Sequence, residues 1–239
     1  MLLRFLVVEI LKLRRSLVML LCATAPALVA IIVVLIGLKT GKSVPMQNYA
    51  QTGAAFWAFA MLPLSLTALS VLMAQMEHGP KSWDHLLALP GARRWMFLAK
   101  ALMLIALTAA MTGWLLALLQ IGAWLIPTFK PVIGAFDITE TATLLGKMFL
   151  ASILMAVLQL WVALRVRSFV PPLVLGILGT FISVAAASAR EGAYFPWLMP
   201  LHMLSSDPAM VVTALRIGCL GGLAALALML VDLGRREAV

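Results

Sequence analysis

The chain has 239 residues, of which 64% are hydrophobic and only 11% are charged, and its net charge is +9. This composition excludes an ordinary water-soluble domain, because such a domain needs more polar surface to cover its core. The excess of basic residues is not interleaved with aromatic side chains as a nucleic-acid-binding surface requires, so we expect no nucleic-acid partner.

Residues 1–16 predict an amphipathic helix that lies in the membrane interface rather than across it. Leucine, isoleucine and phenylalanine side chains supply the apolar area. Glu9 interrupts this apolar run, which argues against a signal peptide. The basic side chains of the segment are expected to contact phospholipid head groups; they are Arg4, Lys12, Arg14 and Arg15.

Six later segments are apolar and long enough to cross a bilayer, which takes about 20 helical residues. They cover residues 17–38, 54–74, 96–126, 143–164, 170–188 and 211–233. The fifth is the shortest and begins with two prolines, which a first helical turn tolerates. The sequence therefore predicts an all-α polytopic membrane protein with about six transmembrane helices in one domain, residues 1–239.

Basic residues predict the orientation of these helices, because Lys and Arg stay on the cytoplasmic side. With the N-terminus inside, the cytoplasmic side holds Arg4, Lys12, Arg14, Arg15, Lys81, Arg93, Arg94, Lys100, Arg165, Arg167, Arg235 and Arg236. The outer side holds only Lys39, Lys42, Lys130, Lys147, Arg190 and Arg216. We therefore expect both termini in the cytoplasm, below a bacterial inner membrane.

The apolar segments offer almost no polar groups for catalysis or ion-driven transport. We expect no ionisable side chain at membrane depth in the first three spans, and we expect Lys147 and Arg216 to extend outward from near helix ends. Residues 37–43 look like a phosphate-binding loop, but the motif is one residue short and follows a helix. Cys22 and Cys219 are expected to pack as apolar side chains. We expect no catalytic residue, metal site or cofactor in this chain.

The most informative segment is the loop of residues 77–94, between the second and third spans. A helix of about two turns is predicted within residues 82–89. Trp83, Leu86 and Leu87 share one face of it at i, i+3 and i+4 spacing. Such a face either lies on lipid or fills a groove on a soluble partner, with the aromatic residue as anchor.

This loop resembles the coupling region of the second class of ATP-binding cassette (ABC) exporter permeases, the ABC-2 type. The branch that it resembles contains the lantibiotic-immunity and bacitracin-export permeases. The resemblance rests on an acidic residue ending the second helix, a Trp-Asp-x-Leu-Leu-x-Leu-Pro segment and an Ala-Lys pair leading into the third helix. The matching residues are Glu77, Trp83, Asp84, Leu86, Leu87, Leu89, Pro90, Arg93, Arg94, Ala99 and Lys100.

The resemblance implies that two permease subunits, identical or similar, pair across a substrate path. It implies a separate cytoplasmic ATPase, which binds ATP and Mg²⁺ and docks beneath each permease. The residues implied to couple the two proteins are Glu77, Trp83, Asp84, Leu86, Leu87, Arg93 and Arg94. Because the predicted path lacks fixed charges, we expect an amphiphilic cargo, a peptide antibiotic or a lipid-like molecule. The branch that the loop resembles adds resistance or immunity to antibiotic peptides as the expected role.

Two further segments of the chain carry predictions of their own. The outer loop, residues 189–208, contains an apolar, proline-interrupted stretch that can form the short re-entrant segment often found in that family. Gly218 and Gly222 permit close contact with a neighbouring helix, which we expect to belong to the same subunit. Two other functions remain open: a structural subunit of a membrane complex that transports nothing, and an intramembrane enzyme.

Overall fold

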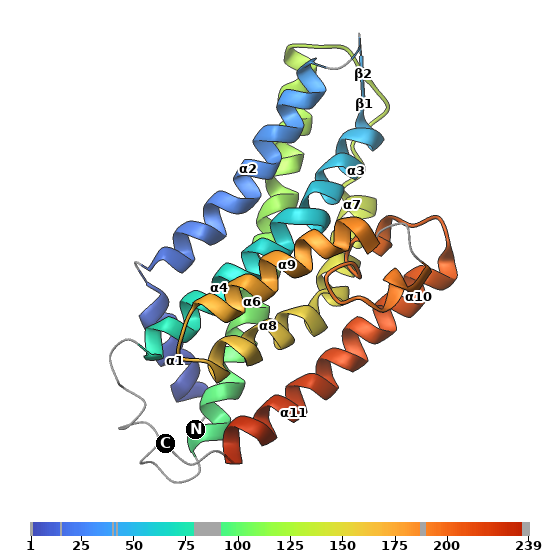
Figure 1. Ribbon diagram of the computed structural model, residues 1–239. Helices are drawn as coiled ribbons and strands as arrows, with labels where there is room; N and C mark the ends of the chain where they lie inside the picture. The colour runs from blue at the N-terminus through green and yellow to red at the C-terminus, as the bar shows by residue number, and fades with distance from the viewer. Residues whose placement is uncertain are drawn as a thin grey trace.

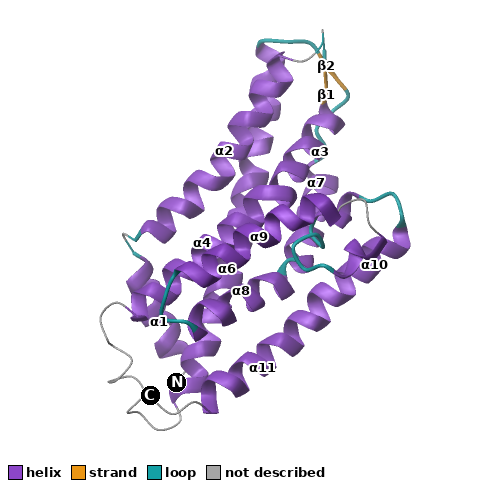
Figure 2. Ribbon diagram, in the orientation of Figure 1, coloured by secondary structure: helices purple, strands orange, loops and turns teal. Residues whose placement is uncertain are grey.

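The computed structural model describes most of the chain, and this part is almost entirely helical (Figures 1 and 2). The described residues are 2–14, 16–39, 41, 43–78, 92–186 and 190–235, with the backbone alone described at 77, 78, 92, 93, 190 and 191. The elements are α1 (Leu2–Leu13), α2 (Leu17–Lys39), β1 (Val44–Pro45), α3 (Met46–Phe56), η1 (Trp57–Met61), α4 (Leu62–His78), α6 (Ala92–Leu125), η2 (Ile126–Thr128), β2 (Val132–Ile133), α7 (Ile138–Ala151), α8 (Ile153–Arg165), α9 (Val170–Ala186), η3 (Arg190–Tyr194), η4 (Leu201–Leu204), α10 (Pro208–Arg216), η5 (Ile217–Gly221) and α11 (Gly222–Arg235).

Five helical runs in the described part are long and apolar enough to cross a membrane. They are Leu17–Lys39, Met46–Met76, Arg94–Thr128, Ile138–Arg165 and Pro208–Arg235. The sixth predicted span, residues 170–188, corresponds to α9, which is apolar but has only 17 residues. The last two residues of that predicted span, 187 and 188, lie outside the described residues. The predicted fold class, an all-α polytopic membrane protein, is confirmed.

The second, fourth and last spans begin earlier than hydropathy predicts, because their first turns carry polar residues. The second begins at Met46, eight residues before the predicted start. The fourth begins after Asp137, whose Oδ1 accepts hydrogen bonds from the backbone N–H groups of Thr139 and Glu140 at 2.8 and 2.9 Å. The last begins after Asp207, which caps its helix in the same way. Carboxylates at these positions stabilise helix starts, although they lower the local hydropathy.

The helices form one elongated bundle with two distinct ends (Figure 1). We call the end that carries α1, the start of α6 and the end of α11 the basal end. The apical end, opposite, carries β1 and β2, which pair in parallel with Val44 beside Val132. There Lys130 Nζ donates to the carbonyl oxygen of Leu38 at 3.0 Å, which ties α2 to the segment after α6.

Glycines allow the last span to lie close against the fourth. A Cβ atom at Gly218 would stand 2.6 Å from the carbonyl oxygen of Ala151, and one at Gly222 would stand 3.0 Å from the amide nitrogen of Leu154. Both neighbours are backbone atoms, so only glycine fits at this separation. The prediction that Gly218 and Gly222 pack within the subunit is confirmed.

The loop before α10 folds back into the bundle instead of extending away from it. Trp197, Leu198 and Met199 are at most 7% exposed. Trp197 lies against Gly179 of α9, where a Cβ atom would stand 2.5 Å from its ring. The short helices η3 and η4 lie on either side of this buried turn. That the loop re-enters the membrane stays a prediction.

Candidate functional site

The basal end contains a buried ion pair between α1 and α6. Lys100 Nζ lies 3.0 Å from both carboxylate oxygens of Glu9. The Lys100 side chain is fully buried and that of Glu9 is 3% exposed. Lys12, one turn after Glu9, places its Nζ 3.5 Å from the same carboxylate and is 32% exposed. The three side chains therefore form a charged joint, which we call the Glu9–Lys100 joint.

The Glu9–Lys100 joint adds a contact that the sequence reading did not give. Lys100 was expected on the cytoplasmic side, near the start of the third span, and it lies six residues after the basal start of that helix. Its partner Glu9, in α1, was not expected. The pair separates two charges from water, which is costly, and its favourable geometry offsets that cost. Removing either side chain would break this buried pair at a cost in stability, so the pair fixes α1 against α6.

Of the predicted coupling residues, the described ones, Glu77, Arg93 and Arg94, lie at this same end. Trp83, Asp84, Leu86 and Leu87 lie outside the described residues, so the contact proposed for these side chains stays a prediction. Glu77 ends α4 and Arg93 begins α6, with only their backbones described. Arg94 is exposed, and its side chain lies beside Gly234 of α11. In the described part, the start of α6, which follows the loop of residues 77–94 in the chain, therefore lies against the end of the last span.

The first helix, α1, presents an apolar face to the surroundings. Leu3 and Leu11 are 77% and 61% exposed, whereas Glu9 and Leu13 are buried. Arg4 and Arg14 are exposed, and Arg15 lies outside the described residues. An exposed leucine face flanked by arginines suits a membrane interface. Contact of Arg4, Lys12, Arg14 and Arg15 with head groups stays a prediction.

A second polar contact at the basal end joins α8 to α11. Asp232 Oδ2 accepts hydrogen bonds from Trp161 Nε1 at 2.8 Å and from Arg165 Nη1 at 3.0 Å. Sequence reasoning missed this contact, since the residues lie far apart in the chain. An aspartate in the last turn of an apolar helix was the available signal, because such a residue needs a partner. Arg165 is 48% exposed, so the ion pair is solvent-screened and weak.

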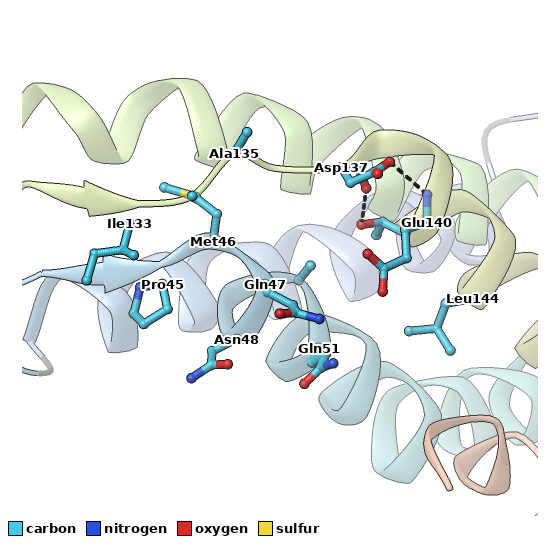
Figure 3. A pocket seen from close by; sticks show the side chains of 13 residues that line it. Pro45, Met46, Gln47, Asn48, Gln51, Ile133, Ala135, Asp137, Glu140 and Leu144 are labelled. Carbon is cyan, nitrogen blue, oxygen red and sulfur yellow. Dashed lines mark hydrogen bonds between the residues drawn. The ribbon is translucent and has the colours of Figure 1, made fainter. Parts of the chain in front are cut away.

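A hollow of about 410 Å³ with polar and apolar side chains opens at the apical end, between α3 and the start of α7 (Figure 3). Gln47, Asn48 and Gln51 project from α3 on one side. Asp137 and Glu140 lie on the other side, where Asp137 Oδ1 also caps α7. Amide and carboxylate groups of this kind offer hydrogen bonds to a polar or cationic group. Sequence reasoning did not single out this hollow, because its two walls come from segments about 90 residues apart.

Comparison with known proteins identifies the family. A family model described as ABC-2 family transporter protein matches residues 5–183, about three quarters of the chain. The matched region contains most of α1, the loop of residues 77–94 and Lys100, and so includes both sides of the Glu9–Lys100 joint. None of the curated proteins matches the chain. On the strength of this match and of the polytopic helical fold, the chain belongs to the ABC-2 family of transporter proteins.

Proposed function

We propose that this chain is the membrane-spanning permease of an ABC exporter, driven by a separate cytoplasmic ATPase that binds ATP and Mg²⁺. The observation that carries the proposal is the family match over residues 5–183. The loop of residues 77–94 lies inside the matched region and has the sequence pattern of a coupling segment. A permease of this kind takes its energy from a partner protein. The apolar spans favour that source, because ion-driven transporters place carboxylates or histidines on the path.

Coupling runs through the helix predicted within residues 82–89. Closure of the ATPase subunits on ATP moves whatever is seated in them, and Trp83 is the anchor, flanked by Leu86 and Leu87. Glu77, Asp84, Arg93 and Arg94 tune this contact, since exposed ion pairs contribute only about 0 to 1 kcal/mol. The movement passes to the start of α6, and the Glu9–Lys100 joint carries it to α1.

Trp83→Ala is expected to weaken binding of the ATPase by roughly 30-fold or more. A buried aromatic anchor at an interface centre is worth about 2 to 4 kcal/mol on truncation, and about 1.4 kcal/mol corresponds to a tenfold change. The measurement is the amount of ATPase that co-purifies with the tagged chain in a mild detergent. Trp124→Ala is the matched control, because Trp124 is 70% exposed near the apical end of α6.

The control variant should retain its ATPase and insert into the membrane as the wild type does. Equal recovery of ATPase with Trp83→Ala and with Trp124→Ala would mean that the predicted helix only lies on lipid. Recovery of a folded chain that never binds an ATPase would favour the alternative, a structural subunit without transport.

The basal end is the cytoplasmic end in this proposal, and the membrane is the bacterial inner membrane. The predicted topology puts twelve of the 18 basic residues on that side, which is the asymmetry that the positive-inside rule expects. The exposed Ser168, in the basal turn between α8 and α9, is suited to a check. With Cys22 and Cys219 replaced, Ser168→Cys should resist an impermeant thiol reagent in intact cells, whereas the exposed Ser206→Cys should react. The reverse pattern would invert the orientation.

The cargo is amphiphilic in this proposal, a peptide antibiotic or a lipid-like molecule. What supports this class is the near absence of charge from the spans, which suits a molecule that travels along apolar surface. The similarity to lantibiotic-immunity and bacitracin-export permeases adds antibiotic-peptide resistance as the role. A second copy of the chain, or a similar permease, completes the path. The exposed apolar faces of α2, α9 and α11 provide surface for such pairing as well as for lipid.

A further inference from the structure

Two hollows adjoin at the apical end, on either side of the start of α3. The first is the hollow of about 410 Å³ between α3 and α7 (Figure 3). The second has a volume of about 400 Å³ and lies between α2 and α3. Pro45 and Asn48 line both hollows, so the two spaces are neighbours. Ligand sites typically have volumes of about 300 to 1,000 Å³. We call the first the acidic hollow and the second the apolar hollow.

Different faces of α3 line the two hollows. Gln47 and Gln51, one turn apart, line the acidic hollow. Asn48 and Thr52, also one turn apart, line the apolar hollow. Successive residues of an α-helix are rotated by about 100° from each other, so these two faces are adjacent. A ligand that extends from one hollow into the other therefore contacts the first two turns of α3.

Packing holds this part of α3 in place. Tyr49 is 3% exposed, and its Oη donates to the carbonyl oxygen of Leu119 in α6 at 3.1 Å. Its ring packs edge-to-face on the ring of Phe136, with the ring centroids 6.2 Å apart. Because Phe136 directly precedes Asp137, the cap of α7, this ring contact joins the two walls of the acidic hollow. The hollow is therefore formed before a ligand binds, which lowers the cost of binding.

Two carboxylates lie on the α7 side of the acidic hollow. Asp137 Oδ1 accepts the backbone hydrogen bonds that cap α7, whereas the Glu140 carboxylate takes no part in that cap. Figure 3 shows the Glu140 side chain directed toward the wall that carries Gln47 and Gln51. Carboxylates accept strong hydrogen bonds from ammonium and guanidinium groups. The acidic hollow is therefore suited to a cationic group.

The apolar hollow is lined mainly by aliphatic side chains and glycine. Val33 and Ile36 come from α2, and Val44 comes from β1. Gly37 and Gly41 add wall without a side chain. A surface of this kind favours a hydrocarbon chain, which leaves water when it enters the hollow. The neighbouring hollows thus match the two parts of one amphiphilic molecule.

The basic residues of the apical end do not line the acidic hollow. Lys130 Nζ donates to two carbonyl oxygens in the last turn of α2, at 3.4 and 3.0 Å. Lys147 follows Glu140 by seven residues, which places its Cα atom about 10 Å farther along α7. The other basic residues of this end either finish α2 or have no described side chain; they are Lys39, Lys42 and Arg190. The described charges are therefore separated, with Lys130 bonded to α2 and the carboxylates beside α7.

We propose that the two hollows together bind a cationic amphiphile. Its ammonium or guanidinium group lies beside Glu140 and Asp137, and its apolar chain lies in the apolar hollow along Ile36. The role of this site rests on the proposed function, in which the apical end is the outer end and the cargo is amphiphilic. The site would then hold the cargo on the outer side, and it narrows the cargo to amphiphiles that carry a positive charge.

The test is binding of three soluble probes to the purified chain in phosphatidylcholine nanodiscs, without ATPase or ATP. Octanoyl-lysinamide has both a cation and an apolar chain, octanoyl-glutaminamide lacks the cation, and acetyl-lysinamide lacks the chain. Isothermal titration calorimetry measures each affinity, with empty nanodiscs as the background. Octanoyl-lysinamide should bind about fivefold or more tightly than either other probe, because each exposed ion pair contributes modestly and the two parts add.

Asp137→Asn/Glu140→Gln should lower the affinity for octanoyl-lysinamide to that for octanoyl-glutaminamide. The fold should survive, because asparagine caps a helix about as well as aspartate does. Asp207→Asn is the matched control. Asp207 caps α10 at the same end, with its Oδ1 accepting from the backbone N–H of Ala209 at 2.9 Å, and it lines neither hollow. This control should keep the wild-type preference for the cationic probe.

Ile36→Ala tests the apolar hollow separately from the charge. It should weaken binding of octanoyl-lysinamide about threefold, through lost apolar contact, and leave acetyl-lysinamide unchanged. Ile31→Ala is the control on the same helix, because Ile31 is 57% exposed and lines neither hollow. It should change neither affinity.

Three outcomes would overturn the proposal. The first is equal binding of octanoyl-lysinamide and octanoyl-glutaminamide to the wild type. The second is an unchanged preference in folded Asp137→Asn/Glu140→Gln. The third is loss of probe binding when phosphatidylethanolamine replaces phosphatidylcholine, since a lipid ammonium group would then occupy the site in place of cargo. None of these measurements uses the ATPase, so a failure here leaves the ATP-driven permease standing, and a failure of ATPase binding leaves this result unchanged.

Discussion

Glu9→Leu is expected to destabilise the protein by about 3 to 5 kcal/mol, because it leaves the Lys100 ammonium buried without its carboxylate. Lys100→Met should cost less, since Lys12 lies 3.5 Å from Glu9 and can still partner it. Glu9→Leu/Lys100→Met should recover most of the stability, because the pair is then replaced by apolar side chains of similar size. The measurement is the free energy of unfolding in detergent, from a denaturant titration.

Arg165→Met is the matched control for the Glu9–Lys100 joint. It breaks an ion pair of the same length, 3.0 Å, in which the arginine is 48% exposed. Its cost should be about 0 to 1 kcal/mol. The assignment fails if Glu9→Leu costs no more than Arg165→Met, or if the double variant costs the sum of its two single changes.

Gly218→Ala is expected to cost about 1 to 3 kcal/mol or more, because the new methyl group meets backbone on a neighbouring helix. Its Cβ would stand 2.6 Å from the carbonyl oxygen and 2.7 Å from the Cα atom of Ala151. Backbone atoms in a packed helix cannot rotate away as a side chain does. The fourth and last spans must separate, or the substitution must unfold η5.

Gly146→Ala is the matched control on α7, because a Cβ atom there meets nothing within 4 Å. It should be neutral or stabilising by up to about 1 kcal/mol, through helix propensity alone. Thermal unfolding of both variants in the same detergent measures the difference. Equal melting temperatures for Gly218→Ala and Gly146→Ala would mean that the spans are not packed as closely as described.

The transmembrane helices could be predicted from sequence because hydropathy depends on composition and length, which are local properties. Their ends were less predictable. The helix α3 includes Gln47, Asn48 and Gln51. Their polar side chains lower the mean hydropathy of a sequence window, but they do not interrupt the backbone hydrogen bonds of the helix. For α9, the described helix runs to Ala186, and the last two residues of the predicted span lie outside the described part of the chain.

The polar contacts between helices could not be predicted in the same way. Glu9 and Lys100 are 91 residues apart, and only the packing of α1 on α6 brings them together. Lys100 belonged to the motif that resembles the coupling region, but the motif gives no partner for it. The pattern at Trp83, Leu86 and Leu87 differs from these polar contacts. An amphipathic helix face predicts that a contact exists, but it does not identify the partner. That prediction awaits the binding experiment.

The central claim is that this ABC-2 family protein is an ATP-driven permease, and ATP turnover in lipid nanodiscs tests it most directly. The purified chain alone should hydrolyse no ATP. The chain purified with its ATPase should hydrolyse ATP, and Trp83→Ala should reduce that turnover while Trp124→Ala leaves it unchanged. Hydrolysis by the chain alone would contradict the account. So would a correctly folded chain, with the Glu9–Lys100 joint intact, that retains no ATPase from membranes of its native host.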